Sequence, residues 1–407
     1  MKIAIVVQRC HESVVGGSEA LAWQYATLLS HQFQVDIITT TAVEYTNWDN
    51  VLSPGVENKQ GISIHRFPVS IGRSAYWHKI HARLIRDFQD LKSSHDGAET
   101  SRRIPWSIAL QEEFIRRQGP YSKSLISFLK ERWMYYQSII FVTYLYPTTY
   151  FGIAEVPPER IILAPTLHDE PTAYLTAYKY MARRARSLVW LTNAERILGE
   201  ELWGELPGRV VSMGVKTIPY SPFKAEYPYI LYCGRIDPSK GCHELINFFI
   251  QFKQSHPSNL RLILTGKDEL GIPSHNEIEF RGFVSPQEKF QLMAGASIFV
   301  MPSPFESFSI VTLEAMAQRT PVLVNGSCQV LVEHVARSGG GKIYQDYEGF
   351  SNAIQELMRA AQNQLTEMGN MARRYVVSNY TFDSVQKCLI EEIKAPFIPR
   401  EGRGKIR

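Results

Sequence analysis

The chain has 407 residues, enough for two domains with separate hydrophobic cores. Hydrophobic residues make up 44% and the net charge is only +4, which is typical of a globular protein and gives no reason to expect a nucleic-acid partner. No apolar run reaches the length of a bilayer span, and five cysteines without a CxxC pair argue against a disulfide framework and a zinc site. We therefore expect a cytoplasmic protein.

The N-terminal half begins with a buried strand and a glycine-containing loop. A strand is predicted over residues 2–8, which are continuously apolar from Ile3 to Val7, as a central parallel strand should be, and it leads to Gly16 and Gly17 before a helix over residues 20–30. A strand, such a loop and a helix start can place backbone N–H groups against a phosphate. The same glycines would also suit a tight turn with positive φ, and the dinucleotide signature GxGxxG is absent. Further strands are predicted over residues 35–41, 62–68, 138–146, 160–166, 187–192 and 209–213.

Residues 70–133 are predicted to form basic helices. Helices are expected over 76–91, 106–118 and 121–133, and residues 71–133 carry twelve Lys and Arg against seven Asp and Glu, with aromatic residues between them. One interpretation is an amphipathic surface that meets an anionic membrane or a lipid-diphosphate acceptor. The alternative, which we favour, is that these helices cover the sheet and expose a solvated basic face.

A histidine follows the predicted strand 160–166. His168, with Asp169 beside it, stands at a strand end, where open α/β sheets place their binding sites. A single histidine at such a position is more often structural than catalytic. Residues 216–228 contain three prolines and are predicted to link two domains.

Two cations follow the first strand of the second half. The predicted strand 229–233 leads into a loop with Arg235 and Lys240. Arg235 offers planar, forked donors and Lys240 a compact charge, and such cations can stabilise a departing nucleoside diphosphate. No Asp-x-Asp pair occurs in the chain, so the sequence offers no such ligand pair for Mg²⁺. The alternative is two surface cations on a turn.

Residues 301–318 combine a strand end, a proline-punctuated turn and a helix start. Ser307 or Ser309 could cap this helix, and the unpaired N–H groups of its first turn would favour an anion. Glu306 and Glu314 bracket the helix start. Eight helical residues span about 12 Å, so the two carboxylates could accept hydrogen bonds from hydroxyls on either side of a diphosphate. The alternative is an exposed glutamate on a turn and another on a solvated helix face.

These motifs resemble those of retaining glycosyltransferases of the GT-B fold, specifically family 4. The resemblance rests on the Glu-x7-Glu spacing and on the G-R-x4-K-G segment that contains Arg235 and Lys240, and it is strongest over residues 229–345. It implies an α/β protein of two doubly wound, Rossmann-like domains with a cleft between them. The implied division is an acceptor-side domain 1–217 with the helical insertion 70–133, a nucleotide-sugar domain 218–379, and a crossing helix and tail 380–407 that return to the first domain.

The resemblance also implies the roles of individual residues. The implied catalytic residues are His168 beside the anomeric carbon, Glu306 on the donor sugar, and Arg235 and Lys240 on the diphosphate. Glu314 would bind the ribose, the backbones of Phe283 and Val284 the base, and the helix start at Phe308 and Ser309, together with Gly16 and Gly17, the diphosphate. No metal ligand and no cofactor besides the nucleotide-sugar substrate are implied.

The resulting hypothesis is a retaining, metal-independent hexosyl transfer from a nucleotide sugar. A UDP-sugar is favoured, with UDP-glucose the first candidate, and the acceptor would be a saccharide or lipid-linked saccharide of surface or extracellular polysaccharide synthesis. A GDP-mannose-dependent mannosyltransferase, a GT-B nucleotide-sugar epimerase and a protein that only binds nucleotide are the alternatives. Peripheral contact with the inner face of the plasma membrane, through residues 70–133, would accompany the membrane interpretation.

Overall fold

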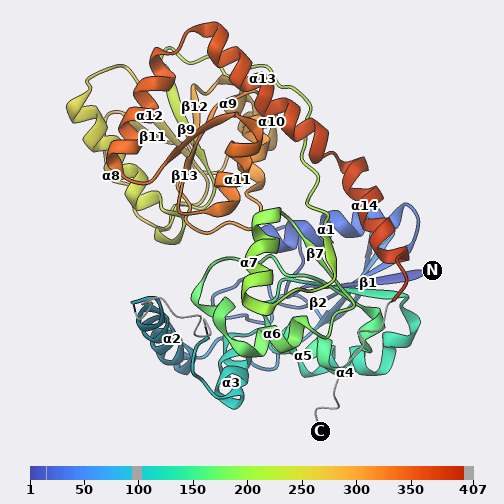
Figure 1. Cartoon of the computed structure of the whole chain (residues 1–407). Coiled ribbons are helices and arrows are strands. Elements are labelled where there is room, and N and C mark those ends of the chain that lie inside the picture. The colour runs from blue at the N-terminus through green and yellow to red at the C-terminus, as the bar shows by residue number, and fades with distance from the viewer. Residues whose placement is uncertain (15, 94–102, 398–407) are drawn as a thin grey trace. The chain divides into compact units, whose positions relative to one another are not determined.

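The chain divides into two compact units in a computed structural model that describes residues 1–14, 16–93 and 103–397. Unit 1 is Met1–Ser212 together with the chain from Gln386, and unit 2 is Met213–Val385. Each unit is an α/β structure in which helices flank a largely or wholly parallel sheet (Figure 1). The domain limits implied by the resemblance stay predictions.

Unit 1 contains an eight-stranded sheet in the order β3-β4-β2-β1-β5-β6-β7-β8. Every neighbouring pair is parallel except β3 and β4, which pair antiparallel at one edge. The strand order reverses between β1 and β5, and such a switch point is where open α/β sheets bind ligands. The strands are β1 Lys2–Val6, β2 Gln34–Thr40, β3 Gly55–Lys59, β4 Ile62–Phe67, β5 Ser138–Val142, β6 Ile161–Ala164, β7 Ser187–Trp190 and β8 Gly208–Val210.

The helices predicted over residues 70–133 are confirmed as α2, α3 and α4. They run over Ala75–Ser93, Ile108–Gln118 and Lys123–Arg132, and the side chains of Ser107 and Ser122 cap the second and third. The other helices of unit 1 are α1 Gly17–Ser30, α5 Pro147–Ala154, α6 Thr176–Ala182 and α7 Asn193–Trp203.

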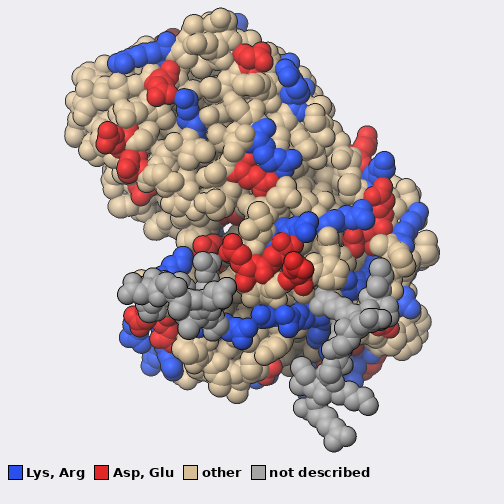
Figure 2. Space-filling model, viewed as in Figure 1, with Lys and Arg blue, Asp and Glu red and all other residues tan. Residues whose placement is uncertain are grey.

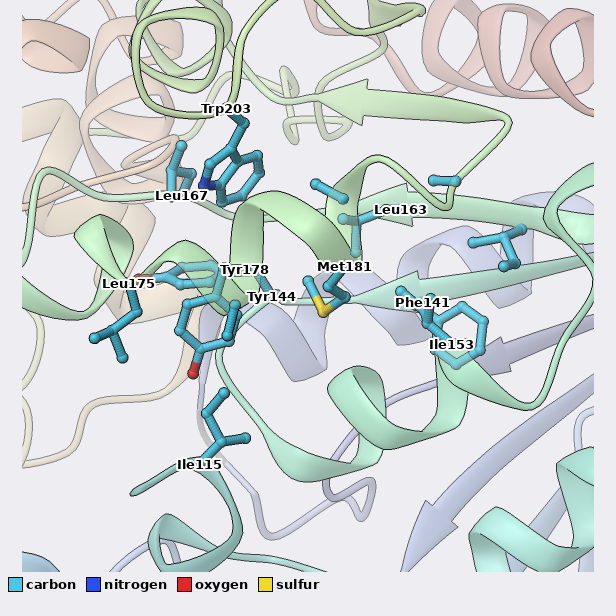
Figure 3. Close-up of a cluster of buried hydrophobic side chains, with 14 of the residues drawn as sticks. Ile115, Phe141, Tyr144, Ile153, Leu163, Leu167, Leu175, Tyr178, Met181 and Trp203 are labelled. Carbon is cyan, nitrogen blue, oxygen red and sulfur yellow. The ribbon is translucent and has the colours of Figure 1, made fainter. Parts of the chain in front are cut away.

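The insertion packs against the core of unit 1. Trp77, Trp106 and Phe114 are buried in the same hydrophobic cluster as the residues drawn in Figure 3, and Tyr76 stays exposed. Figure 2 shows both acidic and basic side chains on the visible part of α2 and α3. These observations favour the interpretation that the helices cover the sheet, and not the interpretation of an aromatic membrane surface, because the large apolar side chains face inward. No helix in the described part of the chain is both long and apolar enough to cross a bilayer.

Unit 2 contains a six-stranded, fully parallel sheet in the order β11-β10-β9-β12-β13-β14. Its switch point lies between β9 and β12. The strands are β9 Tyr229–Cys233, β10 Arg261–Thr265, β11 Ile278–Phe280, β12 Ile298–Met301, β13 Val322–Asn325 and β14 Gly341–Tyr344. The helices are α8 Cys242–Ser255, α9 Pro286–Gly295, α10 Ile310–Ala317, α11 Gln329–Ser338, α12 Tyr347–Arg359 and α13 Gln362–Asn379.

The last helix, α14 (Phe382–Lys394), begins in unit 2 and ends in unit 1. Gln386 donates a hydrogen bond from Nε2 to the carbonyl oxygen of Leu28, at 2.6 Å. Arg186 donates to the carbonyls of Glu392, Ile393 and Ala395, at 3.1, 3.1 and 2.7 Å. These bonds satisfy carbonyl groups that a helix C-terminus leaves unpaired and fix the end of α14 on unit 1.

Candidate active site

Two loops of unit 2 meet at the switch point between β9 and β12. One follows β9 and contains Gly241, and the other follows β12 and begins at Pro302. Gly241 has a left-handed φ of 71°, and a Cβ atom on it would lie 2.3 Å from the carbonyl oxygen of Pro302. Asn325 donates from Nδ2 to the same carbonyl at 2.9 Å. Only glycine therefore allows the two loops to approach this closely.

This approach brings two of the predicted site residues into contact. The Nζ of Lys240 lies 2.7 Å from Oε1 of Glu306, and the two side chains are 28% and 14% exposed. Arg235 is close by on the β9 loop, where its Nε lies 2.5 Å from Oδ2 of Asp237. The other oxygen of Asp237 accepts from the backbone N–H of Lys240 at 3.1 Å, so one carboxylate connects both cations. Both cations thus have a carboxylate partner, which a bound diphosphate would have to replace.

The helix that follows this loop, α10, begins just after Ser309, one of the two residues predicted to cap it. Ser309 occupies the N-cap position of α10 with a left-handed φ of 57°, and its hydroxyl bonds Thr312 Oγ1 at 2.9 Å instead of capping the helix. No side chain caps the helix start, as an anion site requires. Glu306 precedes the helix, so the assumption of a continuous helix from Glu306 to Glu314, on which the estimate of about 12 Å rested, was wrong.

A buried histidine fixes the backbone at the start of α10. His334 of α11 contacts the carbonyl oxygen of Phe308 through Nε2 at 2.8 Å, and its Nδ1 lies 3.1 Å from the hydroxyl of Tyr375. A carbonyl only accepts, so Nε2 carries the proton and donates it to Phe308, and Nδ1 can accept from the tyrosine. Burial lowers the pKa of His334, which favours this neutral form. His334 is therefore a positioning residue, and its apolar helix neighbours carried no signal from which this role could be predicted.

Glu314 is a buried carboxylate with one cationic partner. Its Oε2 lies 2.7 Å from Nζ of Lys289 on α9. Burial raises the pKa of Glu314, and Lys289 opposes that rise. Phe283 and Val284 lie just before α9, and the Phe283 side chain is 71% exposed. Lys289 thus connects the helix after the predicted base-binding segment to the predicted ribose-binding glutamate.

In unit 1, the glycine-containing loop after β1 is held by a buried carboxylate. Gly16 has an extended φ of −174° and Gly17 opens α1, so the interpretation of a positive-φ turn was wrong for this pair. Instead, a Cβ on Gly16 would lie 2.1 Å from Oε2 of Glu19. Glu19 in turn accepts from Gln8 Nε2 at 2.8 Å and pairs with Arg9 Nε at 2.5 Å. Glycine is needed here for close approach of a side chain.

His168 lies in the loop after β6, which a second buried carboxylate holds. Glu195 accepts from the backbone N–H groups of Leu167 at 2.7 Å and Leu191 at 2.5 Å, and burial raises its pKa to about 8. Nδ1 of the His168 ring lies 4.0 Å from Oε1 of Glu170.

The side chain of Asp169 turns to a different partner. Its Oδ1 accepts from the Tyr174 hydroxyl at 2.6 Å. His168, Gly16 and Gly17 belong to unit 1 and the other predicted site residues to unit 2, so the structure describes two separate groups of candidate residues, each of which we call the half-site of its unit.

The unit 2 half-site coincides with a match to known proteins. Residues 227–360 match the family model described as glycosyl transferases group 1. That segment contains every predicted site residue of unit 2. The chain is also similar to the D-inositol 3-phosphate glycosyltransferase of Corynebacterium urealyticum, with 27% identity over 191 residues, 42% of this chain and 44% of that protein. The chain spans less than half the length of the first curated relatives it matches.

Solved structures match the chain over nearly its whole length. Sucrose-phosphate synthase from Thermosynechococcus elongatus matches with a TM-score of 0.67 and 16% identity, over 96% of this chain and 98% of that one. HepE from Anabaena, solved in complex with UDP-glucose, matches with a TM-score of 0.65 and 15% identity, over 97% and 99%. These likenesses confirm the predicted fold, two Rossmann-like domains as in GT-B glycosyltransferases.

Proposed function

We propose that the protein is a glycosyltransferase that moves a hexose from a nucleotide sugar to a saccharide or lipid-linked saccharide, with retention of the anomeric configuration. The observation that carries this proposal is the contact of Lys240 with Glu306 at the switch point of unit 2, beside the uncapped start of α10. A cation, a carboxylate and a helix N-terminus thus belong to one segment that matches the family model, and this supports the proposal.

The proposed chemistry exchanges the partners of these charges. A bound diphosphate takes Lys240 and Arg235 from their carboxylates, and the oxygens of Glu306 then accept hydrogen bonds from the sugar hydroxyls. As the bond from sugar to diphosphate breaks, negative charge grows on the leaving group and the two cations and the α10 start stabilise it. We propose that the departing phosphate oxygen takes the proton of the acceptor hydroxyl, that His168 lies beside the reacting carbon, and that no divalent metal is required.

The proposed donor is a UDP-sugar, with UDP-glucose as the first candidate. It is supported by the likeness in fold to HepE, which was solved with UDP-glucose. GDP-mannose is the second candidate donor. A nucleotide-sugar epimerase would use the same half-site of unit 2 but would need no acceptor.

Calorimetric titration with UDP, GDP and ADP in the presence of EDTA tests this proposal. We expect UDP to bind at least tenfold more tightly than the others, which is about 1.4 kcal/mol, with no effect of the chelator. Incubation with UDP-glucose, followed by analysis of the nucleotide sugars, then separates the classes. Conversion to another UDP-sugar without acceptor would indicate the epimerase, and the lack of binding by all three nucleotides would contradict the proposal.

A further inference from the structure

A second group of charged and aromatic side chains gathers near the switch point of unit 1. Loops after four different strands supply it: Arg9 follows β1, Trp48 follows β2, Arg73 follows β4 and Tyr146 follows β5. The guanidinium groups of Arg9 and Arg73 each lie 5.9 Å from the centre of the Trp48 ring. Arg73 also lies 4.6 Å from the Trp77 ring on α2. Two cations thus lie near one indole, at the edge where an α/β sheet places its ligands.

The indole of Trp48, which lies near both cations, is buried and held by several contacts. Trp48 is only 1% exposed and has a left-handed φ of 64°, a conformation that costs a bulky residue on the order of 1–3 kcal/mol and clusters at functional sites. Its Nε1 donates to the carbonyl oxygen of Gln118 at 2.9 Å, and Nε of Arg73 donates to the same oxygen at 3.3 Å. The ring of Tyr146 packs edge-on against Trp48 at 5.2 Å. The insertion, through Gln118, therefore anchors both the indole and the cation.

The two cations differ in their charge balance. Arg9 pairs with the buried carboxylate of Glu19. Within the described part of the chain, no carboxylate lies within salt-bridge distance of Arg73. Arg73 is half-buried, and burial lowers its pKa. A half-buried guanidinium without an acidic partner bears a desolvation cost that a bound anion would offset.

We propose that Arg73 binds a phosphate group of the acceptor, so that the start of the insertion selects phosphorylated acceptors. This inference rests on the proposed glycosyltransferase function. Stacking on Trp77 fixes the guanidinium plane, and its remaining N–H donors lie in that plane, where they can hold two phosphate oxygens at once. The phosphate can belong to a phosphosugar or to the diphosphate of a lipid-linked saccharide.

Tryptophan fluorescence can follow this site directly, because all seven tryptophans of the chain belong to unit 1. The full-length protein is first saturated with UDP, so that the half-site of unit 2 is occupied. Glucose 6-phosphate, glucose and farnesyl diphosphate are then titrated separately. We expect at least one phosphorylated probe to change the fluorescence and glucose to leave it unchanged. A response to glucose 6-phosphate alone indicates a phosphosugar acceptor, and a response to farnesyl diphosphate alone indicates a lipid-linked one.

Substitution of Arg73 decides whether this residue is responsible. We expect Arg73→Gln to lower the affinity for the phosphorylated probe by roughly tenfold to a hundredfold, and Arg73→Lys to lower it less. Arg116→Gln is the matched control, because Arg116 lies over the Phe151 ring at 4.9 Å in the same insertion but has Glu113 as its partner. The control should bind like the wild type, and thermal unfolding checks that every variant is folded.

Two results would overturn the inference. One is wild-type binding of the phosphorylated probe by the folded Arg73→Gln variant, and the other is the lack of any response to both phosphorylated probes in the wild type. Failure of the proposed function can be distinguished from these results, because it would appear as a lack of nucleotide binding in the calorimetric titration that precedes the fluorescence experiment.

Discussion

The switch points of the two units differ in how their charges are paired. In unit 2, Lys240 and Lys289 each lie 2.7 Å from a carboxylate, whereas Arg73 in unit 1 has indole rings and a carbonyl oxygen as neighbours. A ligand that binds unit 2 must replace these ion pairs, so it gains only the difference in free energy between the old and the new pairs. An anion that binds Arg73 replaces no carboxylate, so it gains the free energy of the new ion pair in full. Under the proposed function, donor binding would therefore rearrange side chains, whereas an acceptor phosphate at Arg73 would not have to replace a carboxylate.

Substitution of Gly241 should have the largest effect, because it separates the two loops on which the pairs of unit 2 depend. Gly271→Ala is the matched control, since Gly271 also has positive φ but nothing lies within 4 Å of its added Cβ. A left-handed alanine costs about 1 kcal/mol, and the clash with Pro302 should raise the cost for Gly241→Ala to about 3 kcal/mol. Differential scanning calorimetry compares the two variants, and UDP titration compares their affinities. Equal stabilities would show that the close approach of the loops is unimportant.

The buried carboxylate of Glu195 should give unit 1 a pH dependence of its own. The folded carboxyl keeps its proton up to a pKa of about 8, whereas the unfolded one loses it near 4.5. The folded state thus binds more protons between these values, and the free energy of unfolding falls as the pH rises from about 4.5 to 8. Glu195→Gln cannot titrate and should flatten this slope. It should also cost about 1–3 kcal/mol, because at least one of the backbone N–H groups that donate to Glu195 loses its acceptor.

Urea unfolding followed by tryptophan fluorescence at several pH values measures this effect in unit 1. Glu200→Gln on the same helix is the control, since Glu200 forms an exposed pair with Arg196 and should change stability by less than about 0.5 kcal/mol. A slope that is unchanged in Glu195→Gln would assign the pH dependence to other groups.

The smallest effect is expected for Glu314→Gln, which tests what the Lys289 pair contributes to the donor site. If Glu314 accepts hydrogen bonds from the ribose hydroxyls, its loss should lower the affinity for UDP about tenfold and leave the affinity for inorganic pyrophosphate unchanged. Burial raises the pKa of Glu314, so wild-type UDP affinity should fall on acidification and the variant should lose that dependence. Calorimetry with both ligands measures this, with Glu356→Gln at an exposed pair with Lys342 as control. An equal loss of affinity for UDP and for pyrophosphate would indicate that Glu314 lies near the phosphates instead of the ribose.

The sequence predicted the central strands and the insertion helices well because burial imposes their pattern. Strands such as Ser138–Val142 are buried at every position, and a continuous apolar run is the expected signature. The edge strand Gly55–Lys59 escaped prediction because four of its five residues are exposed and it lacks alternation. The left-handed backbone of Ser309 also escaped, since a serine before a helix usually signals an ordinary N-cap.

The partners of the site residues were the part that the sequence could not supply. Lys289 and His334 come from helices that carry no motif, and only the packing of α9 and α11 brings them to Glu314 and Phe308. Likewise, nothing in the sequence near Gly16 indicates that a carboxylate three residues later will fold back against it. Motifs identify residues that face a ligand, whereas the groups that hold them follow from tertiary packing.

The most direct test of the account compares UDP and UMP binding to the wild type and to Lys240→Met by calorimetry. If Lys240 binds the second phosphate, the wild type should prefer UDP over UMP, and the variant should lose at least tenfold of that preference with its UMP affinity nearly unchanged. Lys342→Met, which removes an exposed pair with Glu356 in the same unit, should keep the wild-type preference. An undiminished preference for UDP in Lys240→Met would contradict the assignment of the diphosphate to this half-site.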